Sequence, residues 1–242
     1  MKIKTFVFFL FIFMLFFFLP ETKSQIKGIN LVVSVTGSFI DYATRDYVSV
    51  RYEVYDENGK RVGRGKSDKL KKGYYYVTGL RPGKTYTIKI FDLGYLRSEH
   101  KFDIPYTDKY TEYSRDFLVV PRKKNLKMFL RVPPFELGKT KLRYGIEEYL
   151  DFYTKLIKRN PRLKFLVQCY PDKVAEPEYN IKLTEGRANT LKTYFVENGA
   201  KSEKIYAKGS ATVDETNPPP VKKRSKGKRY IGPSYIVIVK VK

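Results

Sequence analysis

The spacing of the apolar residues changes near residue 121, and this change most restricts the folds open to the chain. From about residue 29 to residue 121, apolar and polar residues alternate in short runs separated by turn residues. Beyond residue 125, two stretches have apolar residues at the three- and four-residue spacing of a helix, with short apolar runs between them. Alternation is typical of strands, so the sequence predicts a β-rich part followed by an α/β part.

The first part has the turns of an antiparallel β-domain. A strand expected over 48–55 runs into Asn58-Gly59, a pair that accepts positive φ and therefore favours a hairpin. Residues 74–90 repeat the arrangement of strand, turn and strand. Strands at intervals of about 8–12 residues without helical spacing predict an all-β sandwich of about seven strands, which we place at 25–121.

The second part combines strands with two helices. We interpret 122–125 as a linker and 126–242 as the second domain. Strands are expected at 126–132, 163–169, 204–209 and 235–241, and helices at 146–157 and from Pro177 or Asn180 to Glu197. The element order βαβαβ followed by β predicts an α/β sandwich with the helices on one face of a mixed sheet.

The first 24 residues have the features of a signal peptide. Lys2 and Lys4 precede the apolar run 6–19, and a short polar stretch ends at Ser24. A helix that crosses a bilayer needs roughly 20 apolar residues, and this run is shorter. We therefore predict cleavage near Ser24 and export, with an uncleaved membrane anchor as the alternative.

The charge of the chain predicts an anionic partner. Lysine and arginine number 48 against 25 aspartate and glutamate residues, which gives a formal net charge of +23. Such an excess favours nucleic acid, a membrane surface or an acidic polymer. One run is especially basic and is expected to contact an anionic membrane surface: Lys222, Lys223, Arg224, Lys226, Lys228 and Arg229. No aromatic residues alternate with these cations, so the run does not predict specific binding of nucleic acid.

Two residue types that carry much of enzyme and metal chemistry are almost absent. Cys169 is the single cysteine and His100 the single histidine, which excludes an intramolecular disulfide and a Cys/His zinc cluster. We interpret Cys169 as buried and His100 as a surface residue of a strand. No nucleophile lies in a motif with a positioned base, and we expect no catalysis, no metal and no cofactor.

A polar motif spans a strand of the second part and the helix after it. The strand at 163–169 continues into Tyr170-Pro171-Asp172, and the helix contains Asn180-Ile181-Lys182-Leu183-Thr184-Glu185-Gly186-Arg187-Ala188. Residues 125–242 resemble the C-terminal domain family of outer membrane protein A (OmpA), in which the strand ends in Gly-His-Thr-Asp and the helix reads Asn-x-x-Leu-Ser-x-x-Arg-Ala. Asp172, Asn180 and Arg187 have the family's spacing, and Thr184 replaces the serine.

This resemblance implies that the second domain binds peptidoglycan through a diaminopimelate-type stem peptide. Arg187 is then expected to pair bidentately with the ligand carboxylate, and Asp172 to take the ammonium group. Asn180 lies about two helical turns before Arg187 and would bridge the loop and the ligand, with Thr184 and Tyr170 in support. The alternative from the residues alone is that Asp172 caps the next segment and Arg187 pairs with Glu185 or solvent.

The first part also resembles known modules. Gly73-Tyr74-Tyr75 and the turn at 81–86 are similar to carboxypeptidase regulatory-like and immunoglobulin-like domains, which implies a spacer or a protein-binding platform. Together, the resemblances predict a periplasmic protein associated with the cell wall or outer membrane, which binds peptidoglycan and docks an outer-membrane or other envelope protein. The alternative is a structural interaction module that has lost wall binding, because Cys169-Tyr170-Pro171 replaces Gly-His-Thr and the family's Asn-Arg-Arg is missing.

Overall fold

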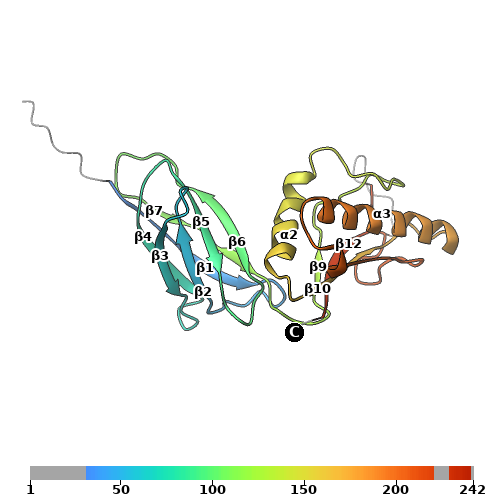
Figure 1. Cartoon of the computed structure of the whole chain (residues 1–242), viewed down its shortest axis with the longest axis horizontal. Coiled ribbons are helices and arrows are strands. Elements are labelled where there is room, and N and C mark those ends of the chain that lie inside the picture. Colours follow the sequence, from blue (N-terminus) through green and yellow to red (C-terminus); the bar gives the residue numbers. More distant parts are fainter. Residues whose placement is uncertain (1–30, 221–228, 241–242) are drawn as a thin grey trace, which may run out of the picture. The chain divides into compact units, whose positions relative to one another are not determined.

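The computed structural model describes residues 31–220 and 229–240 (Figure 1). The predicted signal peptide lies outside these ranges, as do most residues of the basic run: Lys222, Lys223, Arg224, Lys226 and Lys228. Arg229 is described and is exposed. The described part of the chain consists mostly of β-strands, with two α-helices. Neither of these helices has the length and hydropathy needed to cross a bilayer.

The alternating residues of the first part form eight strands among the described residues. They are β1 (Val33–Asp41), β2 (Arg51–Tyr55), β3 (Arg61–Lys66), β4 (Tyr74–Leu80), β5 (Thr85–Ile90), β6 (Ser98–Asp103), β7 (Glu112–Ser114) and β8 (Phe117–Val119). One sheet has the order β4-β1-β7, with β8 also paired to β1, and the other has the order β3-β2-β5-β6. Apolar side chains from both sheets, such as Phe39 and Ile88, share one buried cluster, because alternate residues of each strand face it.

Only one of the two expected strand–turn–strand arrangements is a hairpin. Strands β2 and β3 pair antiparallel across Asn58-Gly59, and Gly59 has a φ of 76°. The second arrangement, at 74–90, is not a hairpin, because β4 pairs with β1 whereas β5 pairs with β2 and β6. The turn at 81–84 therefore connects the two sheets. A turn sequence fixes the local backbone but leaves the partner of each strand to the rest of the fold.

The second part has the predicted order of elements. They are β9 (Lys127–Phe129), α2 (Glu147–Arg159), β10 (Lys164–Cys169), α3 (Pro177–Glu197), a 3₁₀ turn η1 (Ser202–Lys204), β11 (Ile205–Gly209) and β12 (Ser234–Lys240). The sheet has the order β11-β10-β12-β9; β10 and β11 are parallel, and β12 is antiparallel to both of its neighbours. The sheet is therefore mixed, as predicted.

Helix α3 begins and ends where its sequence predicts. Pro177 occupies the first turn, where its missing N–H costs no hydrogen bond. Leu191 and Phe195 are fully buried against the sheet. Gly199 has a φ of 93° directly after Asn198, so glycine permits the left-handed turn that ends the helix. These features hold the polar residues of α3 at fixed positions beside the end of β10.

Candidate functional site

Asp172 and Arg187 form a bidentate ion pair at the carboxyl end of β10. Arg187 Nη1 donates to Asp172 Oδ1 over 2.6 Å, and Nη2 donates to Oδ2 over 2.8 Å. The Arg187 side chain is 0% exposed and the Asp172 side chain 5% exposed. The sequence predicts both residues at one ligand site, and in the structure they lie side by side. They bind each other, however, so the alternative in which Arg187 pairs with Glu185 or solvent is wrong.

The remaining donors of Arg187 bind a loop that precedes α2. Its Nε donates to the Lys139 carbonyl over 2.9 Å, and Nη2 also donates to the Glu136 carbonyl over 3.0 Å. The guanidinium carbon lies 5.3 Å from the centre of the buried Phe135 ring, within range of a cation–π interaction. Arg187 therefore fixes the 136–139 loop as well as Asp172.

Asp172 accepts two backbone hydrogen bonds in addition to those from Arg187. Gly138 N donates to Oδ2 over 2.8 Å, and Gly232 N donates to Oδ1 over 2.7 Å. Burial alone would raise the pKa of Asp172, but the hydrogen bonds from Arg187 and then from the two glycines outweigh it and hold that pKa below its usual range. The carboxylate is consequently ionised at neutral pH.

Gly138 and Gly232 are functional positions that sequence reasoning missed. Gly138 has a φ of 67°, which side chains rarely adopt. A Cβ on Gly232 would lie 2.0 Å from the Tyr170 carbonyl oxygen, so a side chain there would force the backbone apart. Gly232 precedes Pro233, a pair typical of turns, but no spacing rule connects either glycine with Asp172.

Asn180 and Thr184 connect α3 to two other loops. Asn180 is 1% exposed, and its Nδ2 donates to the carbonyls of Lys173, Ala175 and Ala211, the last over 2.9 Å. These three acceptors fix the orientation of the amide. Its Oδ1 has no hydrogen-bond partner within the part of the chain that the structure describes. A buried acceptor without a partner is costly, and a ligand N–H could satisfy it.

Thr184 has a structural role in the arrangement. Its hydroxyl donates to the Asn180 carbonyl over 2.8 Å and accepts a hydrogen bond from Ser210 N over 3.0 Å. A Cβ on Gly209 would lie 2.4 Å from this hydroxyl oxygen, so the helix approaches the end of β11 closely. Thr184 thus holds α3 against the loop that carries one of the Asn180 contacts.

Tyr170 lies in a neighbouring polar cluster. Its ring meets Tyr235 edge-on, with centroids 5.8 Å apart. The Tyr235 hydroxyl donates to Asp214 and accepts from Asn217 Nδ2 over 2.6 Å. These contacts secure the segment before β12, which also contains Gly232. Tyr170 therefore packs beside the segment that supplies one of the Asp172 donors.

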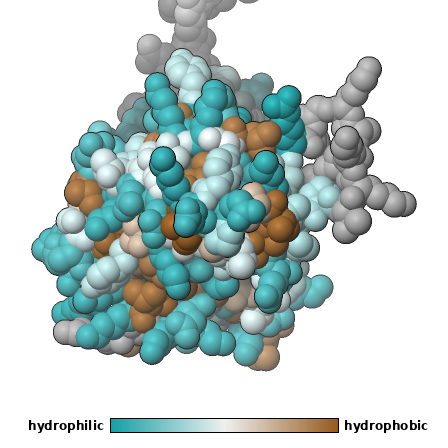
Figure 2. Space-filling model, turned by 90° about the vertical axis from the view of Figure 1, so that its right-hand side faces the viewer, coloured by the Kyte–Doolittle hydropathy of each residue, from teal (hydrophilic) through white to brown (hydrophobic). Residues whose placement is uncertain are grey.

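The surface around the ion pair includes exposed apolar side chains. Leu137 is 42% exposed, Val174 81% and Tyr179 50%, and these residues flank Gly138, Asp172 and Asn180 in the sequence. The face of the molecule shown in Figure 2 is mostly hydrophilic, with separate apolar patches between the polar residues. The candidate site therefore combines a buried charged centre with apolar residues in its loops.

The comparison with protein families identifies the segment that contains this site. Residues 134–227 match the model of the OmpA family. Outer membrane protein A of Serratia marcescens is 35% identical to this chain over 82 residues, which make up 33% of the chain and 23% of that relative. The chain thus matches less than a quarter of the length of this curated relative.

Solved structures show more distant similarity. The peptidoglycan-associated lipoprotein of Burkholderia pseudomallei is 15% identical with a TM-score of 0.36, over 43% of this chain and 86% of that one. The Bacillus anthracis TIE protein is 19% identical with a TM-score of 0.31, over 41% of this chain and 21% of that one.

Proposed function

We propose that this protein, in which residues 134–227 form an OmpA family domain, binds peptidoglycan and catalyses no reaction. The observation that carries the proposal is the ion pair between Asp172 and Arg187 at the end of β10. The pair lies within the matched segment and has the spacing of the family motif. It brings together one anionic and one cationic group, which are the two groups that the free end of diaminopimelate requires.

The chemistry of the pair suits a ligand with both charges. The Arg187 guanidinium is a planar fork that matches a carboxylate, and the ionised Asp172 can accept hydrogen bonds from an ammonium group. Asn180 Oδ1 supplies a further acceptor that no described residue uses. These three groups define the proposed contacts with the stem peptide, while Thr184 and Tyr170 support the loops.

The burial of the pair sets a condition on ligand entry. Arg187 is completely enclosed, and the loop at 136–139 accounts for two of its hydrogen bonds and one of those to Asp172. A ligand must therefore displace this loop, or replace the hydrogen bonds that the backbone of the loop makes to Arg187 and Asp172. The exposed Leu137 and Val174 are placed to contact the rest of a stem peptide.

Sedimentation with diaminopimelate-containing sacculi tests the proposal. The chain without the predicted signal peptide, residues 25–242, is expected to sediment with the sacculi. The variant Asp172→Asn with Arg187→Met removes both charges but leaves an apolar or polar group of similar size in each place, a change that buried ion pairs often tolerate. At about 0.5 M salt, where attraction between exposed charges is screened, it is expected to remain in the supernatant with an unchanged circular dichroism spectrum. Equal sedimentation of a folded variant and the wild type would contradict the proposal.

The second candidate is a structural module that has lost wall binding. The complete enclosure of Arg187 favours it, because Asp172 and the carbonyls of Glu136 and Lys139 already accept hydrogen bonds from its guanidinium. In that case Asp172 and Arg187 act only to hold the loops together. Failure of the wild type to sediment, together with loss of stability in Asp172→Ala, would support this function over the first.

We also propose a role for the first part of the chain. Residues 25–121 would form a domain that docks an outer-membrane or other envelope protein, with 122–125 as the boundary and 126–242 as the wall-binding domain. The fold supplies two sheet faces for such contacts. The proposed location is the periplasm, after cleavage near Ser24, and the basic run 222–229 would add contacts with an anionic membrane surface.

A further inference from the structure

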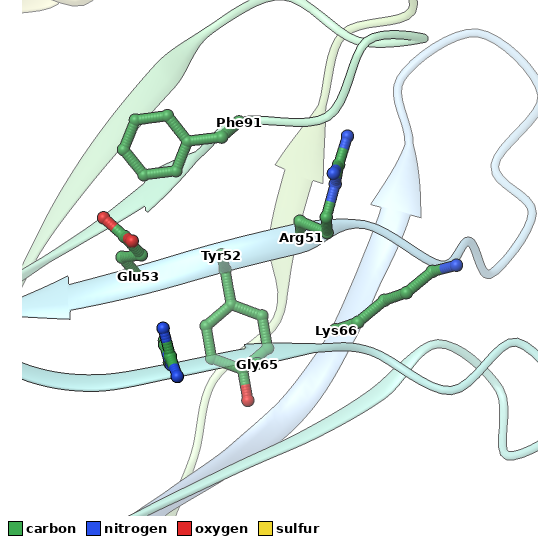
Figure 3. Close-up of a pocket in the computed structure, with 7 residues that line it drawn as sticks. Arg51, Tyr52, Glu53, Gly65, Lys66 and Phe91 are labelled. Atoms are coloured by element: carbon green, nitrogen blue, oxygen red, sulfur yellow. The ribbon is translucent and has the colours of Figure 1, made fainter.

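A groove with basic walls crosses the sheet β3-β2-β5-β6 of the first part (Figure 3). Its volume is about 560 Å³, and it is lined by Arg51, Tyr52, Glu53, Arg64, Gly65, Lys66 and Phe91. Figure 3 shows Arg51 and Phe91 on one side of β2 and Tyr52 on the other. Alternation along β2 and β3 explains this arrangement, because Arg51 and Glu53 pair across the strands with Lys66 and Arg64.

The cations of the groove have little internal compensation. Within the part of the chain that the structure describes, Arg64 and Lys66 have no ion-pair partner. Arg51 is 58% exposed and reaches Asp92 only over 3.7 Å, a long contact at the surface. The carboxylate in the groove, Glu53, is already bound by Arg61 over 2.8 Å and by the Tyr55 hydroxyl. The groove therefore offers positive charge to a partner.

We propose that this groove binds an extended acidic segment of a protein, rich in glutamate or aspartate and containing a large apolar side chain. This inference deepens the docking role proposed for the first domain and rests on it. Arg51 and Arg64 can pair with carboxylates through their planar guanidinium groups. Phe91 is 40% exposed and provides an apolar contact beside them.

The geometry of the groove distinguishes a peptide from other polyanions. Glu53 lies among the cations, and its hydrogen bond with Tyr55, followed by that with Arg61, keeps its pKa below the usual range. This negative charge repels phosphates and carboxylates alike, so the two kinds of partner differ in the donors that they offer to Glu53, and phosphodiester groups carry none. A peptide has backbone N–H groups that can donate to Glu53. Strand β3 also lies at the end of its sheet, where an extended segment can run alongside.

The test compares two double variants that lose the same charge. Arg64→Ala with Lys66→Ala removes two cations of the groove, and Lys201→Ala with Lys208→Ala removes two exposed lysines of the second part. Residues 25–242 of each are titrated into two fluorescein-labelled peptides, one of glutamate alone and one in which glutamate alternates with phenylalanine, and fluorescence anisotropy is measured. We expect the groove variant to bind both peptides at least about 10-fold more weakly, and the control to match the wild type within about twofold.

Further measurements test the apolar contact and compare the acidic peptides with other polyanions. Phe91→Ala should weaken binding of the phenylalanine peptide at least about threefold and leave the glutamate peptide unaffected. Equal losses in both double variants, no binding of either peptide by the wild type, or tighter groove-dependent binding to phosphatidylglycerol vesicles or duplex DNA would each overturn the proposal. The groove variant should still sediment with sacculi if the second domain binds the wall. A wild type that sediments with sacculi but binds neither peptide would therefore count against this inference and not against the peptidoglycan proposal.

Discussion

Arg187 carries a full charge in a completely buried position, and its neighbours explain how the fold tolerates it. Two carboxylate oxygens and two backbone carbonyl oxygens surround the guanidinium, and all three of its nitrogens donate hydrogen bonds to them. Removing water from an ion costs several kcal/mol, and only close and well-aligned partners offset that cost. The pair therefore depends on both of its members, whether or not a ligand binds.

Loss of Asp172 should be strongly destabilising. Asp172→Ala leaves the buried Arg187 charge without its counter-ion and is expected to lower the free energy of unfolding by about 3–5 kcal/mol. Urea denaturation measures this loss. The matched control is Asp151→Ala, which breaks a half-exposed ion pair with Lys155 on α2 and should cost less than about 1 kcal/mol. Equal losses in the two variants would show that the Asp172 pair is not enclosed as described.

Gly232 should tolerate no side chain. Gly232→Ala would place a Cβ 2.0 Å from the Tyr170 carbonyl oxygen, and the backbone must move to relieve the clash. The movement would lengthen the hydrogen bond from Gly232 N to Asp172. We expect a loss of about 1–3 kcal/mol in urea denaturation. Gly94→Ala is the control, since its added Cβ meets the Asp92 carboxylate only at 3.8 Å; a similar loss there would refute this explanation.

Helix α3 serves as a support that links several loops through Asn180, Thr184 and Arg187. Thr184→Val keeps the side-chain shape but leaves the Ser210 N–H without its acceptor, so we expect a loss of about 1–3 kcal/mol. Thr190→Val on the same helix is the control, because the Thr190 hydroxyl donates only within α3, to the Gly186 carbonyl. Thermal unfolding of the two variants gives the comparison, and equal midpoints would contradict the supporting role of Thr184.

His100 lies on strand β6, and its ring packs against aromatic rings of strand β8 and helix α2, although the sequence predicts it to be at the surface. The ring lies 5.3 Å from the Phe117 ring and 5.8 Å from the Phe152 ring, measured between centroids. Burial lowers the pKa of His100 to about 4, although Glu99 opposes the shift. His100 is a strand residue, as predicted, but it is half-buried, because aromatic residues from other elements pack against its ring.

The half-buried His100 should make stability depend on pH in mildly acidic solution. Below about pH 6.5 the unfolded chain binds a proton at this position, and the folded protein does not until about pH 4. The free energy of unfolding should therefore fall as the pH decreases across this window, by at most about 1.4 kcal/mol per pH unit. Urea denaturation from pH 7 to pH 4.5 should show a smaller slope for His100→Gln than for the wild type. Identical slopes would rule out a lowered pKa of His100 in the folded protein.

The sequence predicts the elements of the second part well, and the contacts of its site less well. Helical spacing and caps locate α3, and the family spacing brings Asp172 and Arg187 together. Their enclosure depends on Gly138 and Gly232, which lie far from both residues in the sequence and are brought to them by the tertiary fold. Pairing of β4 with β1 escapes prediction for a similar reason, since alternation identifies a strand without identifying its neighbour.

At the scale of the whole molecule, two kinds of charge have different functions. The Asp172–Arg187 pair is buried and neutral overall, whereas most of the net charge of +23 belongs to surface side chains and to the basic run at 222–229. Salt screens exposed charges, with a Debye length of about 8 Å at 0.15 M, but acts weakly on buried groups. Ionic strength can therefore separate general attraction to an anionic wall from specific recognition.

This difference gives a final prediction for sacculus binding. Between about 0.05 and 0.5 M salt, a variant with all six cations of the run 222–229 replaced by alanine should lose less affinity than the wild type, because fewer cationic side chains contribute to its binding. The variant Asp172→Asn with Arg187→Met should keep only the salt-sensitive part of sacculus binding. Its sedimentation should therefore disappear at the higher salt concentration, while that of the wild type remains. If the two proteins lose sedimentation in parallel, charge attraction alone accounts for binding and the buried pair takes no part in it.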